Sequence, residues 1–263
     1  MSKLKILYVA SEIKPFLTSS DVADYVHKLP QAMQEMGMEI RILVPRFGII
    51  NERKNRLHEV VRLSGINISV GDEEKPLQIK VASIPNAKLQ VYFIDNDDYF
   101  QRKSMFTDKD NQFHEDNDER AIFFCKGVIE TVKKLGWAPD IVHCNDCMTS
   151  FIPLYLKTTY KNDPVFKDTK TVFTIYDSYF SHKFDGSMML GKAKMLDVDD
   201  EALTQLQTAD YAGFINTGVR FSDTVVRATS NCKAVDSEAP VAQQDDDTFS
   251  DFYYNLYTQL KSC

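Results

Sequence analysis

The stretch L-K-I-L-Y-V-A, residues 4–10, decides the fold of this chain. It is a short apolar run of the kind that forms a strand buried on both faces of a sheet. A second such run, E-I-R-I-L-V-P at residues 39–45, follows after one helical segment. A strand, a helix and a second strand in this order predict a βαβ unit, which has a right-handed crossover and two parallel strands.

The segment between these two runs carries the pattern of an amphipathic helix. Its apolar residues recur at helical spacing: Val22, Val26, Leu29, Met33 and Met36. Ser20 can cap the first turn, and Gly37 is suited to end the last one. Pro30 lies inside the pattern and should kink the helix. We therefore expect one kinked helix between Ser20 and Gly37.

Residues 57–95 differ from this opening. They hold four β-rich runs, separated by short polar turns: H-E-V-V-R-L, I-N-I-S-V, L-Q-I-K-V-A-S-I and L-Q-V-Y-F-I. Strands spaced this closely, without helices between them, predict antiparallel hairpins inserted beside the parallel sheet. A charged loop over residues 95–118 ends at a helix cap, and the helix that follows stops at Gly136.

After Gly136, strand and helix alternate again, in the order D-I-V-H-C, F-I-P-L-Y-L-K and T-V-F-T-I-Y. The fold class is therefore α/β: a Rossmann-like, doubly wound, mostly parallel sheet with an inserted antiparallel hairpin region. We predict that this domain covers residues 1–230 and that the polar, acidic residues 231–248 are a linker. Residues 249–263 carry a helical apolar stripe and should dock back on the domain: Phe249, Phe252, Tyr253, Leu256, Tyr257 and Leu260.

Composition excludes several classes of protein. A formal net charge of -7 over 263 residues argues against binding to nucleic acid or to an anionic membrane surface. The opening residues lack the apolar core and cleavage site of a signal peptide, and no apolar run is long enough to span a membrane. Five cysteines, an odd number in a long chain, do not suggest a disulfide framework. We expect a cytoplasmic protein with reduced thiols.

The stretch H-C-N-D-C, residues 143–147, contains a C-x-x-C pair where a strand gives way to a helix. A redox pair occupies such a place in thioredoxin-like proteins, where the helix N-terminus stabilises a thiolate. Here, however, several βα units precede the pair. For zinc, His143 points to the opposite side of its strand from Cys144, and no further ligand pair occurs, so we predict no metal site. Two reduced thiols without a chemical role are the favoured interpretation.

Polar residues also follow the strands of the predicted sheet. They are Ser11, Glu12, Asp95, His143, Asn145, Asp146, Tyr176 and Asp177. In an open α/β sheet, ligands bind outside the carboxyl ends of the strands. Helix capping and turn formation explain these residues one by one. Together they form a polar rim that could face a cleft for a hydroxyl-rich ligand. The chain has no dinucleotide-binding glycine motif and no P-loop, so no cofactor is predicted.

Several blocks, in order, resemble the glycogen and starch synthases. S-E-I-K-P-F-L-T-S-S-D-V-A-D-Y-V is similar to the opening S-E-x-x-P-F-x-K-T-G-G-L-A-D-V of that family, and P-D-I-V-H-C-N-D-C-M to its P-D-V-V-H-x-H-D-W-H. E-D-N-D-E-R-A-I-F-F and K-T-V-F-T-I-Y-D match two further blocks. The match runs from Met1 to roughly residue 230, and short, single-domain members from Bacteroides-type bacteria are similar as well.

This resemblance implies the N-terminal, acceptor-side half of a GT-B fold. Enzymes of this kind transfer glucose from ADP- or UDP-glucose to an α-1,4-glucan without a metal or cofactor. The resemblance implies nine substrate-binding candidates: Thr18, Ser19, Ser20, Asp24, Asp116, Arg120, His143, Asp146 and Asp177. The chain also departs from the family, because Leu17, Ser19 and Ser20 replace a lysine and two glycines, and Met148 replaces a histidine. No residue is assigned a catalytic role.

Two functions follow from the resemblance. The first is a glucosyltransferase domain that is inactive unless a protein partner supplies the donor-binding half. The alternative is a non-catalytic domain that binds glucan or regulates a full-length synthase. Loss of the lysine removes a charge partner for the diphosphate of the donor, and one wall of a cleft cannot orient both substrates. A C-x-x-C oxidoreductase would instead require a reversible disulfide between Cys144 and Cys147.

Overall fold

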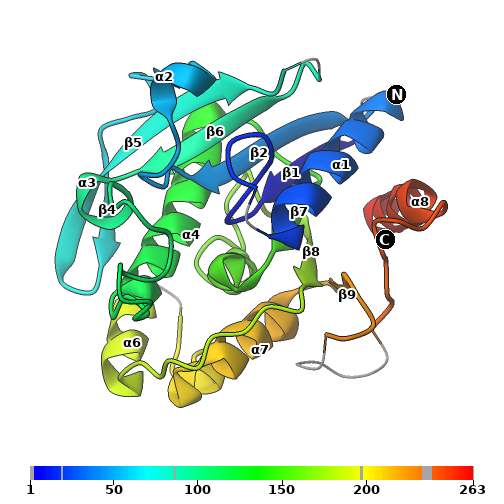
Figure 1. Ribbon diagram of the computed structural model, residues 1–263. Coiled ribbons are helices and arrows are strands. Elements are labelled where there is room, and N and C mark those ends of the chain that lie inside the picture. The colour runs from blue at the N-terminus through cyan, green and yellow to red at the C-terminus, as the bar shows by residue number, and fades with distance from the viewer. Residues whose placement is uncertain (1–2, 19, 86, 196–197, 233–238, 263) are drawn as a thin grey trace.

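The computed structural model describes residues 3–18, 20–85, 87–195, 198–232 and 239–262. Within these ranges one nine-stranded sheet has the order β3-β5-β6-β2-β1-β7-β8-β9, with β4 paired to β5 (Figure 1). The strands are β1 (Lys5–Val9), β2 (Glu39–Pro45), β3 (His58–Glu59), β4 (Ile66–Val70), β5 (Glu73–Ser83), β6 (Gln90–Asp95), β7 (Ile141–Asn145), β8 (Lys170–Ile175) and β9 (Thr224–Arg227).

The sheet is parallel at its centre and antiparallel at one edge. β1 pairs in parallel with both β2 and β7, and Tyr8 lies opposite His143 in that register. β6, β8 and β9 extend the parallel part, whereas β3, β4 and β6 all pair with β5 in antiparallel fashion. The predicted α/β class, the first βαβ unit and the inserted hairpin region are therefore confirmed.

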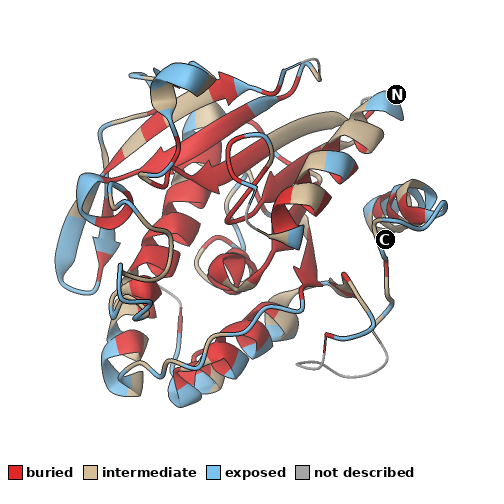
Figure 2. Ribbon diagram, in the orientation of Figure 1, coloured by how far each residue is buried: buried red, intermediate tan, exposed pale blue. Residues whose placement is uncertain are grey.

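Helices cover both faces of this sheet. They are α1 (Asp21–Glu35), α2 (Glu52–Asn55), α3 (Asp97–Phe100), α4 (Asn117–Leu135), α5 (Phe151–Lys157), α6 (Gly186–Ala193), α7 (Tyr211–Phe221) and α8 (Phe249–Ser262), with short 3₁₀ helices η1 (Cys147–Thr149) and η2 (Thr204–Thr208). α1 contacts α8 and β2, while α5 packs against both α4 and α7 (Figure 1). Consecutive residues along β1 and β7 are thus buried from both sides (Figure 2).

Two helix starts differ in detail from the sequence-based expectation. Ser20 occupies the N-cap position of α1, but its side chain accepts no hydrogen bond from the first turn. The helix runs through Pro30 without interruption and ends before Gly37, which has a positive φ of 93°. α4 begins at Asn117, one residue before the predicted cap at Asp118, because Asp116 takes the N-cap position.

The acidic segment after β9 also contributes to the sheet. Residues 233–238 of the predicted linker lie outside the described residues. Beyond them, Val241 forms a parallel bridge with Arg227, and Ala242 is buried. α8 then buries Phe249, Tyr253 and Tyr257 against the domain. The predicted C-terminal docking helix is present, and the segment that leads to it extends the sheet beside β9.

Candidate functional site

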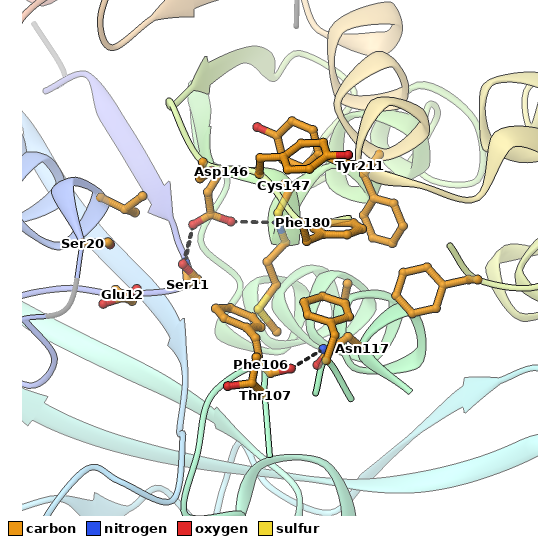
Figure 3. Close-up of a pocket in the computed structure, with 18 residues that line it drawn as sticks. Ser11, Glu12, Ser20, Phe106, Thr107, Asn117, Asp146, Cys147, Phe180 and Tyr211 are labelled. Carbon is orange, nitrogen blue, oxygen red and sulfur yellow. Dashed lines mark hydrogen bonds between the residues drawn. The ribbon is translucent and has the colours of Figure 1, made fainter. Parts of the chain in front are cut away.

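A cleft of about 290 Å³ lies at the carboxyl ends of the central strands (Figure 3). Ser11 and Glu12 reach it directly after β1, and Asp146, Cys147 and Met148 reach it directly after β7. Asn117 and Ala121 of α4 line another side. This is the edge of the sheet at which open α/β folds bind ligands, as the sequence predicted.

Asp146 is the most constrained residue of the cleft. Its backbone has a positive φ of 70°, which few residues other than glycine adopt without cost. One carboxylate oxygen accepts hydrogen bonds from the backbone N–H of Ser11 at 2.9 Å and from the Ser11 hydroxyl at 2.6 Å. The other oxygen accepts from the N–H of Met148 at 2.8 Å, which caps η1. Burial raises the pKa of Asp146 to about 7, despite these bonds.

Aromatic rings form most of the remaining wall. They come from three segments: the loop before α4 (Phe106 and Phe113), the segment after β8 (Tyr179, Phe180 and Phe184) and α7 (Tyr211 and Phe214). Phe113 stacks on Phe180 with a centroid distance of 4.8 Å, and Phe180 meets Phe214 edge to face at 5.8 Å. Apart from Phe106, the rings of the wall therefore form one packed cluster, which fixes their positions.

The cleft offers no basic side chain, among its described lining residues, to neutralise a negatively charged ligand. Among its described lining residues none is lysine, arginine or histidine, and Glu12 and Asp146 are acidic. The amide of Asn117 already donates to the carbonyl of Phe106 at 2.8 Å. The hydroxyl of Ser20 is buried and has no hydrogen-bond partner among the residues described. The described part of the cleft thus offers no positive charge to a ligand.

A second cavity of about 420 Å³ adjoins the first. The two share Ser178, Tyr179, Phe180 and Tyr211 as lining residues. The second cavity is more polar, since Asp177, Ser181, Lys183 and Asp210 also line it. Asp177 is exposed there, so this candidate of the sequence analysis lies near the cleft but not in it.

His143 does not reach the cleft. Its ring is fully buried on the α8 side of the sheet, with Nδ1 2.6 Å from the Tyr257 hydroxyl and Nε2 2.7 Å from the Thr174 hydroxyl. Burial lowers its pKa to about 3, which keeps the imidazole neutral. Because successive side chains of a strand point to opposite faces, β7 directs His143 toward α8, away from the residues that line the cleft.

Arg120 is also occupied elsewhere. Its Nε donates to the carbonyl of Tyr99 at 2.7 Å, and an Nη donates to the side-chain oxygen of Asn117. The guanidinium lies over the rings of Phe47 and Phe100, at 5.4 and 5.5 Å from their centroids. Burial lowers its pKa to about 10. Arg120 therefore ties the loop around α3 to α4, and it is not among the residues that line the cleft.

The other candidates scatter. Asp116 accepts a hydrogen bond from Arg102 at 2.7 Å; burial alone would raise its pKa, but Arg102 holds it below the usual value. Asp24 pairs with Lys14 and lines a separate polar hollow between α1 and α8. Thr18 is exposed, Ser19 lies outside the described residues, and Ser20 lines the cleft. Of the nine candidates, the structure brings Ser20 and Asp146 together in the cleft, with Asp177 in the adjoining cavity.

Asp95, expected on the polar rim, belongs to a buried ion cluster instead. One of its oxygens lies 3.0 Å from Arg46 and 3.1 Å from Lys80, and Glu52 completes the cluster. The expectation that Asp95 and His143 face one cleft with Asp146 is therefore wrong. Conversely, the sequence analysis missed the aromatic wall. Its signal was available in Y-D-S-Y-F-S-H-K-F, residues 176–184, an aromatic-rich run directly after a strand.

The C-x-x-C pair lacks the features of a redox centre. Cys144 is fully buried, Cys147 is half-buried in the cleft, and both thiols are free. Burial raises the pKa of both, and the Asp146 carboxylate adds to the effect. A redox-active thiol needs a lowered pKa. In the described ranges, no three His, Cys, Asp or Glu side chains gather as metal ligands.

Comparison with known proteins places this geometry in a family. Residues 5–233 match the family model of the starch synthase catalytic domain. A glycogen synthase of Chlorobium limicola is 46% identical over 176 residues, which are 66% of this chain and 36% of that protein. A glycogen synthase of Chlorobaculum tepidum is 40% identical over 223 residues, or 84% of this chain and 45% of that protein. The chain thus spans less than half the length of these relatives.

The fold has a counterpart among solved structures. The catalytic domain of starch synthase IV from Arabidopsis thaliana, bound to ADP and acarbose, superposes with a TM-score of 0.70 at 19% identity. The match covers 86% of this chain and 45% of that one. The helices in the described ranges lack the combination of length and apolar composition that a membrane span requires. On the extent of the family match and the identity to the glycogen synthases, this chain belongs to the starch synthase catalytic domain family.

Proposed function

We propose that this chain is the acceptor-side domain of a glycogen- or starch-synthase-type glucosyltransferase, which transfers glucose from ADP- or UDP-glucose to an α-1,4-glucan. The observation that carries this proposal is the family match over residues 5–233. It is supported by the position of the cleft, which opens at the carboxyl ends of β1 and β7, next to Asp146. Acceptor hydroxyls could donate to this carboxylate, and the aromatic wall could cover the apolar faces of glucose rings.

We further propose that the 263 residues need a donor-binding partner, either another part of the same polypeptide or a separate protein. A nucleotide diphosphate requires cations or clustered N–H donors. The described cleft offers no basic side chain, and Leu17 stands where the family resemblance expects a lysine. A single cleft wall also cannot hold donor and acceptor in reacting geometry. We place the reaction in the cytoplasm, a location that the free thiols of the described cysteines support.

Glucosyl transfer tests both proposals. The purified chain would be incubated with glycogen and radiolabelled ADP-glucose or UDP-glucose, alone, in host lysate, and mixed with the donor-binding half of a related glycogen synthase. We expect label in the glucan only when a donor-binding half is present. Label incorporated by the chain alone would contradict the need for a partner. If no label enters the glucan in any of the three mixtures, the chain is not a glucosyltransferase domain.

A pair of variants tests whether glucosyl transfer depends on the cleft. Asp146→Asn keeps one acceptor oxygen, for either the Ser11 or the Met148 donors, replaces the other oxygen by an NH2 group and removes the carboxylate charge. We expect a roughly tenfold loss of transfer, because hydrogen bonds to a charged group are stronger than those to a neutral one. Asp200→Asn is the control, since Asp200 is exposed and does not line the cleft. Equal rates of glucosyl transfer by the two variants would show that the Asp146 carboxylate does not contribute to the reaction.

A further inference from the structure

We infer that the cleft and the adjoining cavity form one extended site for an uncharged glucan chain, and that Tyr179 is its stacking platform. This inference rests on the proposed function and adds to it the residue that sets ligand choice. Tyr179 lines both the 290 Å³ cleft and the 420 Å³ cavity. A chain of sugar rings that leaves the cleft toward the second cavity would therefore cross Tyr179.

The exposure of Tyr179 is unusual for its size. Its relative accessibility is 77%, whereas the neighbouring ring of Tyr211 is buried at 6%. The two rings meet edge to face with centroids 5.5 Å apart, and Tyr211 also meets Phe180 edge to face at 5.4 Å. Tyr179 thus stands on a packed aromatic base with its own surface open to solvent. A ring that is already positioned loses little freedom when a ligand covers it.

The two compartments offer complementary groups along this path. The inner cleft combines an aromatic wall with polar side chains such as Ser11, Asn117 and Asp146. The outer cavity adds the carboxylates of Asp177 and Asp210 and the hydroxyl of Ser181. Glucose rings present apolar faces and a rim of hydroxyls, so they match aromatic surfaces bordered by hydrogen-bond acceptors.

The same lining disfavours the charged substrate. No described residue of the inner cleft is basic, and the outer cavity contributes Lys183 against Asp177 and Asp210. A diphosphate placed in the inner cleft would lose its hydration without gaining a cation, which is unfavourable. Glu12 and Asp146 would add repulsion. Neutral maltooligosaccharides should therefore bind this chain better than nucleotide-glucose does.

Calorimetric titration of the 263-residue chain with maltoheptaose and with ADP-glucose tests this inference. We expect wild-type protein to bind maltoheptaose at least tenfold more tightly than ADP-glucose, by the charge argument above. Tyr179→Ala should weaken maltoheptaose binding roughly five- to tenfold, since an aromatic contact of this kind contributes about 1 kcal/mol. Tyr179→Phe should bind like wild type because it keeps the ring.

Tyr254→Ala is the matched control. Tyr254 is also partly exposed, at 39%, but lies on α8, which lines neither cavity. If Tyr179→Ala and Tyr254→Ala bind maltoheptaose equally well, Tyr179 is not a platform, while the proposed transferase function stands. Tighter binding of ADP-glucose than of maltoheptaose would overturn the assignment of the cleft to the neutral substrate. Absence of maltoheptaose binding by wild type overturns this inference, whereas only the transfer assay decides the proposed function.

Discussion

The hydroxyl of Tyr257 lies 2.6 Å from Nδ1 of His143, a residue 114 positions earlier in the chain. One arrangement of hydrogens satisfies this bond and all its neighbours. Tyr8 donates to Tyr257, so Tyr257 donates to Nδ1, and the imidazole is left to donate from Nε2. The chain of donors then continues through buried groups: Thr174, Tyr253, Tyr25 and the carbonyl of Ala242. α8 is thus fastened to the sheet by a directional hydrogen-bond network.

Removal of one link should loosen α8. Tyr257→Phe leaves the buried Tyr8 hydroxyl and Nδ1 of His143 without their partner, and an unsatisfied buried group costs about 1–3 kcal/mol. We expect the free energy of unfolding in urea to fall by about 2 kcal/mol. Tyr254→Phe, on the exposed side of the same helix, should change it by less than about 0.5 kcal/mol. Equal effects of the two variants would contradict a structural role for the network.

Asp146 should make the protein less stable as the pH rises. Burial raises its pKa from 3.8 to about 7, so between these values the folded protein holds a proton that the unfolded chain has released. Stability from this group is therefore present at low pH and lost as the pH rises through 7. At about 1.4 kcal/mol per pKa unit, wild type should lose up to about 4 kcal/mol relative to Asp146→Asn between pH 4 and 8.

The measurement is the difference between two unfolding curves at each pH. Other carboxylates titrate alike in both proteins and cancel from the difference. Asparagine has the same shape as aspartate, so the strain of the positive φ at position 146 is similar in both proteins and the backbone stays comparable. A difference that does not change between pH 4 and 8 would mean that the carboxyl of Asp146 has an ordinary pKa.

His143 should act in the opposite direction. Burial lowers its pKa from 6.5 to about 3. Between these pH values the imidazole is protonated in the unfolded chain but stays neutral in the folded protein. Stability is therefore lost as the pH falls from about 6.5 to about 3, by up to about 5 kcal/mol. His143→Gln lacks this group and should show a shallower loss in acid, even though its stability at neutral pH is lower. If both proteins lose the same stability as the pH falls, the imidazole of His143 is exposed to solvent rather than buried beneath α8.

Much of the fold could be predicted because its signals are local. The apolar runs that became β1 and β2, and the stripe of α1 between them, are readable within a window of about one helix length. The region between β8 and β9 was not assigned. α6, η2 and α7 lie there. The first two are short elements held by distant groups, as when Lys192 of α6 pairs with Asp118 at 3.0 Å. Such contacts leave no periodic signal.

The site was predictable only in part for a related reason. The rule that ligands gather at carboxyl strand ends correctly singled out Asp146. Alternation along a strand also predicts that His143 and Cys144 point to opposite faces of the sheet, but it does not predict which face a helix will cover. α8 covers the face of His143, and α8 comes more than 100 residues later in the chain. The aromatic wall was missed because Phe113, Tyr179 and Phe214 come from three segments that only the folded chain brings together.

The thiols of the C-x-x-C pair should be unreactive in the folded protein. Cys144 is fully buried, and Cys147 is half-buried beside the carboxylate of Asp146, so both pKa values lie above the ordinary one. The thiolate is the reactive form, and each unit of raised pKa lowers its population about tenfold. We expect iodoacetamide at pH 7.5 to alkylate Cys147 at least tenfold more slowly than free cysteine, and Cys144 only after unfolding. Mass spectrometry of labelled peptides from wild type, Cys144→Ser and Cys147→Ser assigns each site. A disulfide between these two residues that forms reversibly in glutathione buffer would contradict this expectation and restore the oxidoreductase hypothesis, because exchange requires accessible, reactive thiols.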